Sequence, residues 1–164
     1  MQDLLPDLFD QYDTQLSLLA PHYRQFGQKR IFWGEVVTVK CFEDNSKVKQ
    51  LLAQPGEGRV LVVDGGGSNR RALLGDMIAQ SAVDNGWSGI VINGYVRDVG
   101  ALAQMPIGIQ ALGATPIKTD KRDIGDVNVT LEIDRVIIKP GMMLYADDNG
   151  VAVSSEQLDL SQLA

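Results

Sequence analysis

The sequence predicts an α/β protein with a mixed sheet or partial barrel, and two patterns lead to this prediction. Between residues 31 and 114, segments rich in β-branched residues alternate with segments whose apolar residues recur at helical spacing. After residue 128, short strand-like runs are separated by turn sequences such as Pro140-Gly141 and residues 148–150. The 164 residues contain no recognisable linker or internal repeat, so a single domain over residues 1–164 is expected.

The first elements follow from apolar spacing and helix-stop signals. Residues 3–20 predict a short, interrupted helix that ends before Pro21. Residues 31–42 are β-branched and aromatic and predict a strand with a candidate bulge at Gly34. Residues 44–54 begin with N-cap candidates and have apolar residues at helical spacing, so they predict the next helix.

A strand and a glycine turn form the centre of the chain. Residues 59–64 are almost continuously apolar, which is typical of a strand buried on both faces. The three glycines at residues 65–67 indicate a tight turn or a close backbone approach. A phosphate-binding loop is the weaker interpretation, because GxGxxG and GK[ST] are both missing and a short apolar strand over 71–74 follows too soon for a nucleotide-binding helix.

The chain then predicts a helix that starts at Asp76, with Asp76 as its N-cap, and ends near residue 86. A buried strand over residues 88–92 follows, with a turn at residues 93–94. The remaining elements of this half are a short helix, a short strand and a charged loop, over residues 99–105, 109–114 and 118–128.

Two points in this region have the residue types needed for chemistry. The helix start at Gly75-Asp76 offers unpaired N–H groups and a partial positive charge, which suit a carboxylate ligand, although capping is the simplest role for Asp76. The second point is Arg97-Asp98, which follows Asp76 after twenty residues, enough for one helix and one return strand to bring both points to one cleft. On an extended segment neighbouring side chains point in opposite directions, so no mutual salt bridge is expected. Two interpretations remain: each residue pairs with another element, or an anion-binding Arg97 lies beside a metal-binding Asp98.

Composition excludes several other classes of function. The net charge of −6 argues against a phosphate-backbone interface, and the basic residues at 118–122 are interpreted as a solvated loop. Cys41 is the only cysteine, so an intrachain disulfide is impossible, and His22 is the only histidine, which argues against a zinc site. The N-terminus lacks the pattern of a signal peptide and no apolar run is long enough to span a membrane, so a cytoplasmic protein is expected.

Four segments together resemble a known family. They are VLVVDGGGSNRRALLGD, INGYVRD, IGIQALGATP and PGMMLYADDNGVAV. In this order and spacing they resemble the family of the regulator of ribonuclease activity A, which also contains the class II 4-hydroxy-4-methyl-2-oxoglutarate aldolases. The resemblance runs from about residue 10 to 155 and implies a cytoplasmic protein with a swivelling α/β/β fold that assembles into a ring-shaped homotrimer. Apolar faces in the C-terminal strands (Val136, Ile137, Ile138, Met142, Met143 and Leu144) would be covered by subunit packing.

The resemblance also implies roles for particular residues. In the aldolase members, pyruvate is bound by the backbone at the helix start and by the arginine of a D-x20-R-D pattern, and the final aspartate holds a divalent metal. The matching substrate-binding positions here are Gly75, Asp76, Met77, Ile78 and Arg97, and the metal position is Asp98. Arg97 and Asp76 are the candidate catalytic residues, and Mg²⁺ or Mn²⁺ is the expected metal.

Two hypotheses about function follow. The first is a metal-dependent aldolase that cleaves 4-hydroxy-4-methyl-2-oxoglutarate to pyruvate, with oxaloacetate decarboxylation as a side activity, because both reactions produce a pyruvate enolate. The intact pattern at Asp76, Arg97 and Asp98 favours it. The second is a regulator that binds and inhibits the endoribonuclease RNase E, which the whole-chain resemblance and the acidic composition favour.

Overall fold

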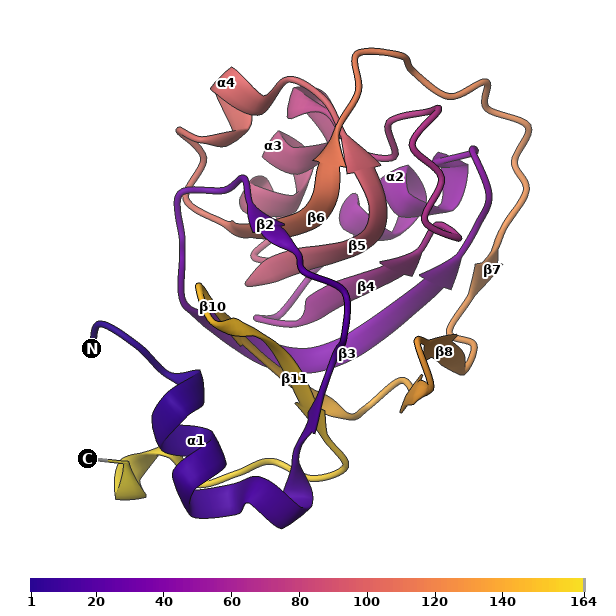
Figure 1. Cartoon of the computed structure of the whole chain (residues 1–164). Helices are drawn as coiled ribbons and strands as arrows, with labels where there is room; N and C mark the ends of the chain where they lie inside the picture. Colours follow the sequence, from indigo (N-terminus) through magenta and orange to yellow (C-terminus); the bar gives the residue numbers. More distant parts are fainter. Residues whose placement is uncertain (164) are drawn as a thin grey trace.

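The computed structural model describes residues 1–163, and its centre is a curled mixed sheet of nine strands (Figure 1). The sheet path is β1 (Ser17–Leu18), β11 (Gly150–Ser154), β10 (Met143–Asp147), β3 (Phe32–Lys40), β4 (Val60–Asp64), β5 (Gly89–Val96), β6 (Gly108–Ala114) and β2 (Arg24–Gln25). The short strand β7 (Asp126–Val127) pairs with β3 outside this path. The predicted α/β class with a mixed sheet is confirmed.

Four neighbouring strands of this sheet, β3, β4, β5 and β6, are parallel. Their carboxyl ends therefore meet at one edge, which is where open α/β sheets place their ligands. Val60, Leu61, Val62 and Val63 of β4 are completely buried, because side chains pack on both faces of a central parallel strand. The predicted buried strand is thus confirmed.

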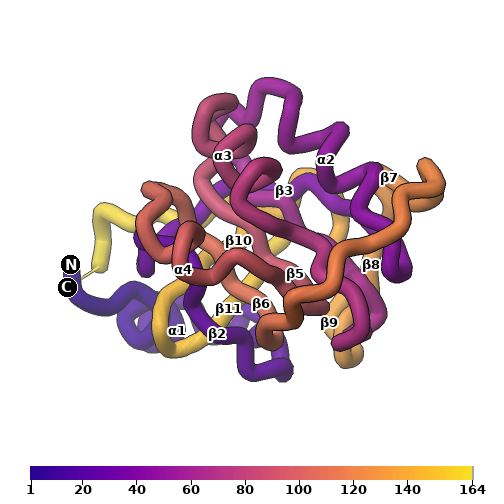
Figure 2. The backbone as a smooth tube through the Cα atoms, turned by 90° about the horizontal axis from the view of Figure 1, so that it is seen from above, coloured from indigo at the N-terminus to yellow at the C-terminus, as the bar shows by residue number. Residues whose placement is uncertain are grey.

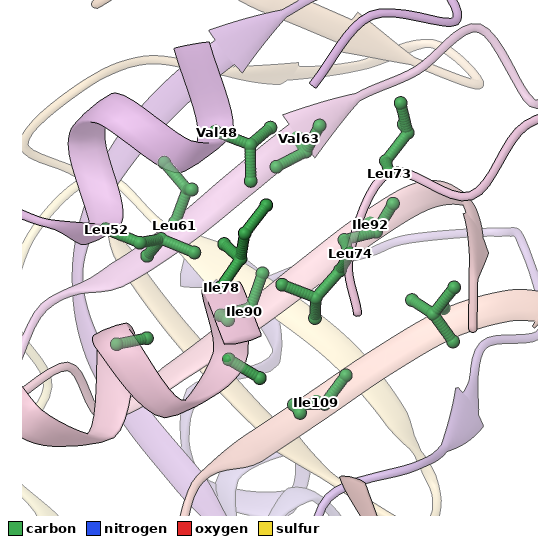
Figure 3. Close-up of a cluster of buried hydrophobic side chains, with 14 of the residues drawn as sticks. Val48, Leu52, Leu61, Val63, Leu73, Leu74, Ile78, Ile90, Ile92 and Ile109 are labelled. Atoms are coloured by element: carbon green, nitrogen blue, oxygen red, sulfur yellow. The ribbon is translucent and has the colours of Figure 1, made fainter. Parts of the chain in front are cut away.

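Helices α2 (Ser46–Leu52), α3 (Asp76–Asp84) and α4 (Val99–Leu102) cover one face of the parallel strands. Figure 3 shows Val48 and Leu52 of α2 and Ile78 of α3 above aliphatic side chains of β4, β5 and β6. Each fully buried aliphatic side chain contributes about 1.5–3 kcal/mol, so this layer fixes the start of α3 against the ends of the strands.

The opposite face is covered by the C-terminal half of the chain. Hairpin β8 (Leu131–Ile133) and β9 (Val136–Ile138) packs with β10 and β11 over Phe32 and Val91. Ile138 and Leu144 are buried within the chain, while Ile137 is 45% exposed. The chain therefore covers most of the apolar surface that was assigned to a neighbouring subunit, and the homotrimer stays a prediction.

Helix α1 (Leu5–Tyr12) and the last described residues of the chain lie side by side (Figures 1 and 2). The helix packs against Tyr145 and Leu158, and the hydroxyl of Tyr12 donates a hydrogen bond to the carbonyl of Asp159 at 2.8 Å. The C-terminus has a single 3-10 turn, η2 (Leu160–Gln162).

The predicted helix over residues 3–20 is wrong beyond Gln15. After α1 the chain makes one 3-10 turn, η1 (Asp13–Gln15), and residues 17–18 then pair with β11 as β1. No helix among residues 1–163 is both long and apolar enough to cross a membrane.

The glycine turn is confirmed, and three other local predictions are corrected. Gly66 and Gly67 have positive φ values of 66° and 72°. The predicted turn at residues 93–94 is wrong, since β5 continues to Val96 and the carbonyl of Asn93 accepts hydrogen bonds from Gly65 and Gly67 at 3.0 and 3.1 Å.

The other two corrections concern strands. The predicted strand at 71–74 is reduced to isolated bridges from Ala72 to Tyr95 and Lys118. The predicted bulge at Gly34 is not present, because β3 keeps a regular register with β4 and β10. Gly34 instead allows a close approach, since a Cβ atom there would lie 2.4 Å from the carbonyl oxygen of Gly58.

Candidate active site

A cavity of about 260 Å³ lies at the carboxyl ends of the parallel strands. The predicted site residues Gly75, Asp76, Met77, Ile78, Arg97 and Asp98 all line it. In Figure 1 the chain leaves β6 at its arrowhead and crosses towards β7, and this connection supplies Lys118, Thr119 and Lys121 to the cavity lining. The further lining residues are Asn45, Lys49, Ala53, Ala72, Ser81, Lys118, Thr119 and Lys121.

Helix α3 is capped by a side chain from a distant segment. Gly75 is its extended N-cap residue, and Asp76 is the first helical residue, so the prediction of Asp76 as N-cap is wrong. The backbone N–H of Asp76 donates a hydrogen bond to Oδ2 of Asp98 at 3.0 Å. The carboxylate of Asp98 thus satisfies one of the orphan N–H groups and lies at the positive end of the helix.

Arg97 and Asp98 face each other, contrary to the expectation from an extended segment. Asp98 has a left-handed conformation (φ 57°, ψ 40°) that turns the chain from β5 into α4. Nε of Arg97 consequently lies 3.8 Å from Oδ2 of Asp98, with the two side chains 39% and 37% exposed. A pair this exposed stabilises the fold by at most about 1 kcal/mol, so both groups stay accessible to a ligand.

Gly75 is required by this arrangement. A Cβ atom at residue 75 would lie 2.6 Å from Oδ2 of Asp98 and 3.3 Å from Nε of Arg97. Two backbone hydrogen bonds hold the segment before it, from Leu73 N–H to the Tyr95 carbonyl at 2.8 Å and from Arg97 N–H to the Leu74 carbonyl at 2.9 Å. Backbone hydrogen bonds therefore connect the segment that starts α3 to the segment that carries Arg97 and Asp98.

The first turn of α3 also presents unused donors. The backbone N–H groups of Met77 and Ile78 donate no hydrogen bond to any residue in the range 1–163. The side chain of Met77 is 83% exposed and that of Ile78 is buried in the core, so only the backbone of these residues offers polar groups to the cavity.

Sequence reasoning missed a group of polar residues in the cavity. Thr119 is buried and donates a hydrogen bond from its hydroxyl to Oδ1 of Asn45 at 2.7 Å. The same cavity is also lined by Lys49, Lys118 and Lys121. The signal that would have found them is their position, because they follow the carboxyl ends of β3 and β6, which are parallel to β4 and β5.

The oxygen ligands of the cavity fit a hard divalent cation that is bound by few protein side chains. Within residues 1–163 there is no group of three or more His, Cys, Asp or Glu side chains that would hold a metal. The cavity carboxylates are Asp76 and Asp98, and Oδ1 of Asp98 accepts no hydrogen bond from residues 1–163. Mg²⁺ and Mn²⁺ suit such a site, since oxygen ligands are preferred and Mg²⁺ binds proteins through one or two carboxylates while keeping several waters.

The comparisons with known protein families and with individual proteins agree on one family. The sequence matches the RraA-like family, described as Aldolase/RraA, over residues 3–153. It is 64% identical over 163 residues to a protein of Shewanella oneidensis, covering 99% of both chains. It is 52% identical over 161 residues to a protein of Vibrio cholerae, covering 98% of this chain and all of the other. Both relatives bear the name "Putative 4-hydroxy-4-methyl-2-oxoglutarate aldolase".

Two solved structures share the fold over nearly the whole chain. One is named the RNA-processing inhibitor RraA from a Thermus species, with a TM-score of 0.92 and 42% identity over 97% of this chain and 96% of that chain. The other is named an S-adenosylmethionine:2-dimethylmenaquinone methyltransferase from Geobacillus kaustophilus, with a TM-score of 0.94 and 41% identity over 99% of this chain and all of that chain. The chain therefore belongs to the RraA-like, or Aldolase/RraA, family.

Proposed function

We propose that the chain is a lyase that releases pyruvate from 4-hydroxy-4-methyl-2-oxoglutarate, and that it also decarboxylates oxaloacetate. One observation carries the proposal: the open first turn of α3, Arg97 and the carboxylate of Asp98 line the same cavity. The aldolase name of relatives at 52–64% identity supports the same reaction type.

Binding of the 2-oxo acid group uses donors that are already in place. The N–H groups of Met77 and Ile78 and the positive end of α3 would receive the substrate's C1 carboxylate. The guanidinium of Arg97 would donate charge-assisted hydrogen bonds to the C2 oxygen, where negative charge develops. The backbone around these donors is already in place, because Leu73 is hydrogen-bonded to Tyr95 of β5 and Leu74 to Arg97.

In the cleavage step, the bond between C3 and C4 of the substrate breaks. Loss of the proton from the C4 hydroxyl breaks the C3–C4 bond, the electron pair moves to the C2 oxygen as an enolate, and the C4 fragment leaves as pyruvate. Protonation of the enolate at C3 gives the second pyruvate. In oxaloacetate the same bond breaks with C4 leaving as CO₂. Asp76 would exchange these protons through water; its exposure and its position in the cavity lining support this role.

Asp98 would hold a divalent metal, Mg²⁺ or Mn²⁺, with Asp76 close by. The metal would supply Lewis-acid stabilisation of negative charge on the substrate's oxygens. The protein's part is to fix the carboxylate of Asp98, through the N–H of Asp76 and the neighbouring Arg97.

A coupled assay tests the proposal. Pyruvate formed from each substrate is followed through NADH oxidation by lactate dehydrogenase, with Mg²⁺, with Mn²⁺, and after treatment with EDTA. We expect metal-dependent pyruvate from both substrates, above the rate without protein. If pyruvate appears at the uncatalysed rate with every metal and both substrates, the chain is not this lyase.

A second candidate function is inhibition of an RNA-processing endoribonuclease of the RNase E type. Its support is the 42% identity to a structure named as an RNA-processing inhibitor. The two functions are separable, because an inhibitor acts through its surface and does not need the metal carboxylate. We expect inhibition of RNase E cleavage to be the same for the wild type and for Asp98→Asn. No effect of the wild type on cleavage at micromolar concentration would exclude the regulator.

A further inference from the structure

Three lysines of the same cavity have no role in the reaction proposed above. Lys49 lies on α2, and Lys118 and Lys121 lie on the loop that follows β6. None of the three forms an ion pair with a residue in the part of the chain that the structure describes. The chain as a whole has a net charge of −6, so three unpaired cations around one cavity are a local reversal of sign.

The loop that carries two of these lysines is anchored. Asp44 is 4% exposed, and its Oδ2 accepts hydrogen bonds from the backbone N–H groups of Arg122 and Ile124 at 2.8 and 3.2 Å. Thr119, between the two lysines in sequence, is tied to Asn45. The interpretation of this loop as simply solvated is therefore incomplete, because its backbone is held against the start of α2.

A comparison with the other lysine of α2 shows which of these lysines are neutralised by an ion pair. Lys47, also on α2, is neutralised by Asp123 at 2.8 Å and does not line the cavity. Lys49 and Lys121 line the cavity and also an adjoining hollow next to α2. The loop has two acidic side chains: Asp123 is paired with a lysine outside the cavity, and Asp120 lines a separate hollow with Arg71 and Arg122. Neither lines the cavity, so its lysines are available to an anion.

We propose that Lys49, Lys118 and Lys121 bind the distal carboxylate of the substrate and make the site selective for dicarboxylic 2-oxo acids. This inference rests on the proposed function, in which Arg97 and the start of α3 bind the 2-oxo acid end. A second carboxylate needs cations away from that end, and the lysines supply them from α2 and the β6–β7 loop. Flexible ammonium groups act as point charges, so they tolerate distal carboxylates on chains of different length.

Binding of two non-reacting probes tests the subsite without turnover. 2-Oxoglutarate and 2-oxopentanoate have the same five-carbon chain and differ at the distal end, where one has a carboxylate and the other a methyl group. By calorimetry with Mg²⁺ present, we expect the wild type to bind 2-oxoglutarate at least about tenfold more tightly. The triple variant Lys49→Gln, Lys118→Gln, Lys121→Gln should bind both probes equally, while Lys139→Gln, which removes a lysine outside the cavity, should behave as the wild type.

Kinetics give the matching measurement. The triple variant should lose about tenfold or more in kcat/KM for 4-hydroxy-4-methyl-2-oxoglutarate and change little for the monocarboxylic 4-hydroxy-2-oxopentanoate. Equal binding of the two probes by the wild type would overturn the inference, and so would a triple variant that keeps the preference. A wild type that prefers 2-oxoglutarate through these lysines but cleaves neither substrate supports the subsite and refutes the lyase.

Discussion

The carboxylate of Asp98 accepts a hydrogen bond at 3.0 Å from the backbone N–H of Asp76, across 22 residues of sequence. One oxygen of Asp98 is thereby fixed at the start of α3, and the other accepts no hydrogen bond from residues 1–163. The contact joins the candidate metal ligand to the helix end that would bind the substrate's carboxylate. It also makes the geometry sensitive to the residue before Asp76, because Gly75 lies against both Asp98 and Arg97.

Gly75→Ala should lower activity strongly while leaving the fold intact. The new methyl group would meet Oδ2 of Asp98 at 2.6 Å, so the carboxylate must move from the start of α3. Gly100→Ala is the matched control, since nothing lies within 4 Å of a Cβ atom there. We expect kcat/KM for pyruvate release to fall by about 10²-fold in Gly75→Ala, the usual scale for a misplaced catalytic group, and to stay unchanged in Gly100→Ala. Equal activities for the two variants would show that Asp98 need not occupy this position.

Asp98→Asn should nearly abolish pyruvate production, and excess Mg²⁺ should restore only part of it. Asparagine tolerates the left-handed backbone at residue 98 and still accepts the N–H of Asp76, so the change removes charge with little effect on shape. Titration of Mg²⁺ in the coupled assay measures the effect, with circular dichroism as the check on folding. The same Mg²⁺ requirement as the wild type would mean that Asp98 does not hold the metal.

Arg97→Lys keeps the positive charge and loses the planar donor fork. Turnover should fall and the KM for the 2-oxo acid should rise, by about 10²-fold together in kcat/KM. Steady-state kinetics on oxaloacetate measure both parameters. Wild-type kinetics in both Arg97→Lys and Asp98→Asn would show that the pair is structural and that the active site lies elsewhere.

Asp76→Asn separates a structural role from a chemical one. As the first residue of α3, Asp76 contributes only about 0.3–1 kcal/mol through the helix dipole, and its exposed side chain does not cap the helix. Urea unfolding should therefore change little, while kcat should fall by about 10²-fold or more if the carboxylate moves protons. Unaltered kcat would leave Asp76 without a role in proton transfer.

Local sequence signals predicted most of the fold. The apolar run of β4, the triple-glycine turn, and the spacing of Ile78, Ala79 and Ala82 on α3 each identify one element, and each element forms. The errors occur where tertiary pairing overrides a local preference. Asn93-Gly94 is a strong turn signal, but the carbonyl of Asn93 is used by the glycine turn, so β5 continues through it.

Only two segments of the candidate site were predictable from the sequence. The segments around Gly75 and Arg97 lie in one cavity as expected, because one helix and one strand separate them. The direction of the Asp98 side chain was not predictable, since a left-handed aspartate is rare and its conformation is set by contacts at the start of α3. The contribution of Lys49 and the β6–β7 loop depends on the parallel pairing of β3 and β6 with their neighbours, which a single sequence does not specify.

Stability at acid pH should depend on the anchor of that loop. Burial raises the pKa of Asp44, but hydrogen bonds from the hydroxyl and N–H of Ser46 and from the N–H groups of Arg122 and Ile124 outweigh it and lower the pKa from 3.8 to about 2. Because the folded pKa lies below the unfolded one, this stabilisation is present above about pH 4 and is lost as the pH falls towards 2. At 1.36 kcal/mol for each pH unit the shift corresponds to about 2 kcal/mol.

Asp44→Asn should therefore be less stable than the wild type by about 2 kcal/mol at pH 7, and the difference should shrink as the pH approaches 2. Urea unfolding from pH 7 to 2.5 measures it. Asp148→Asn serves as the control, because Asp148 makes an exposed ion pair with Arg30 and its loss should change stability by less than about 1 kcal/mol. The loop held by Asp44 carries Lys121, so Asp44→Asn should also weaken binding of 2-oxoglutarate more than that of 2-oxopentanoate. A stability difference that does not vary with pH would show that the Asp44 carboxylate does not stabilise the fold through its charge.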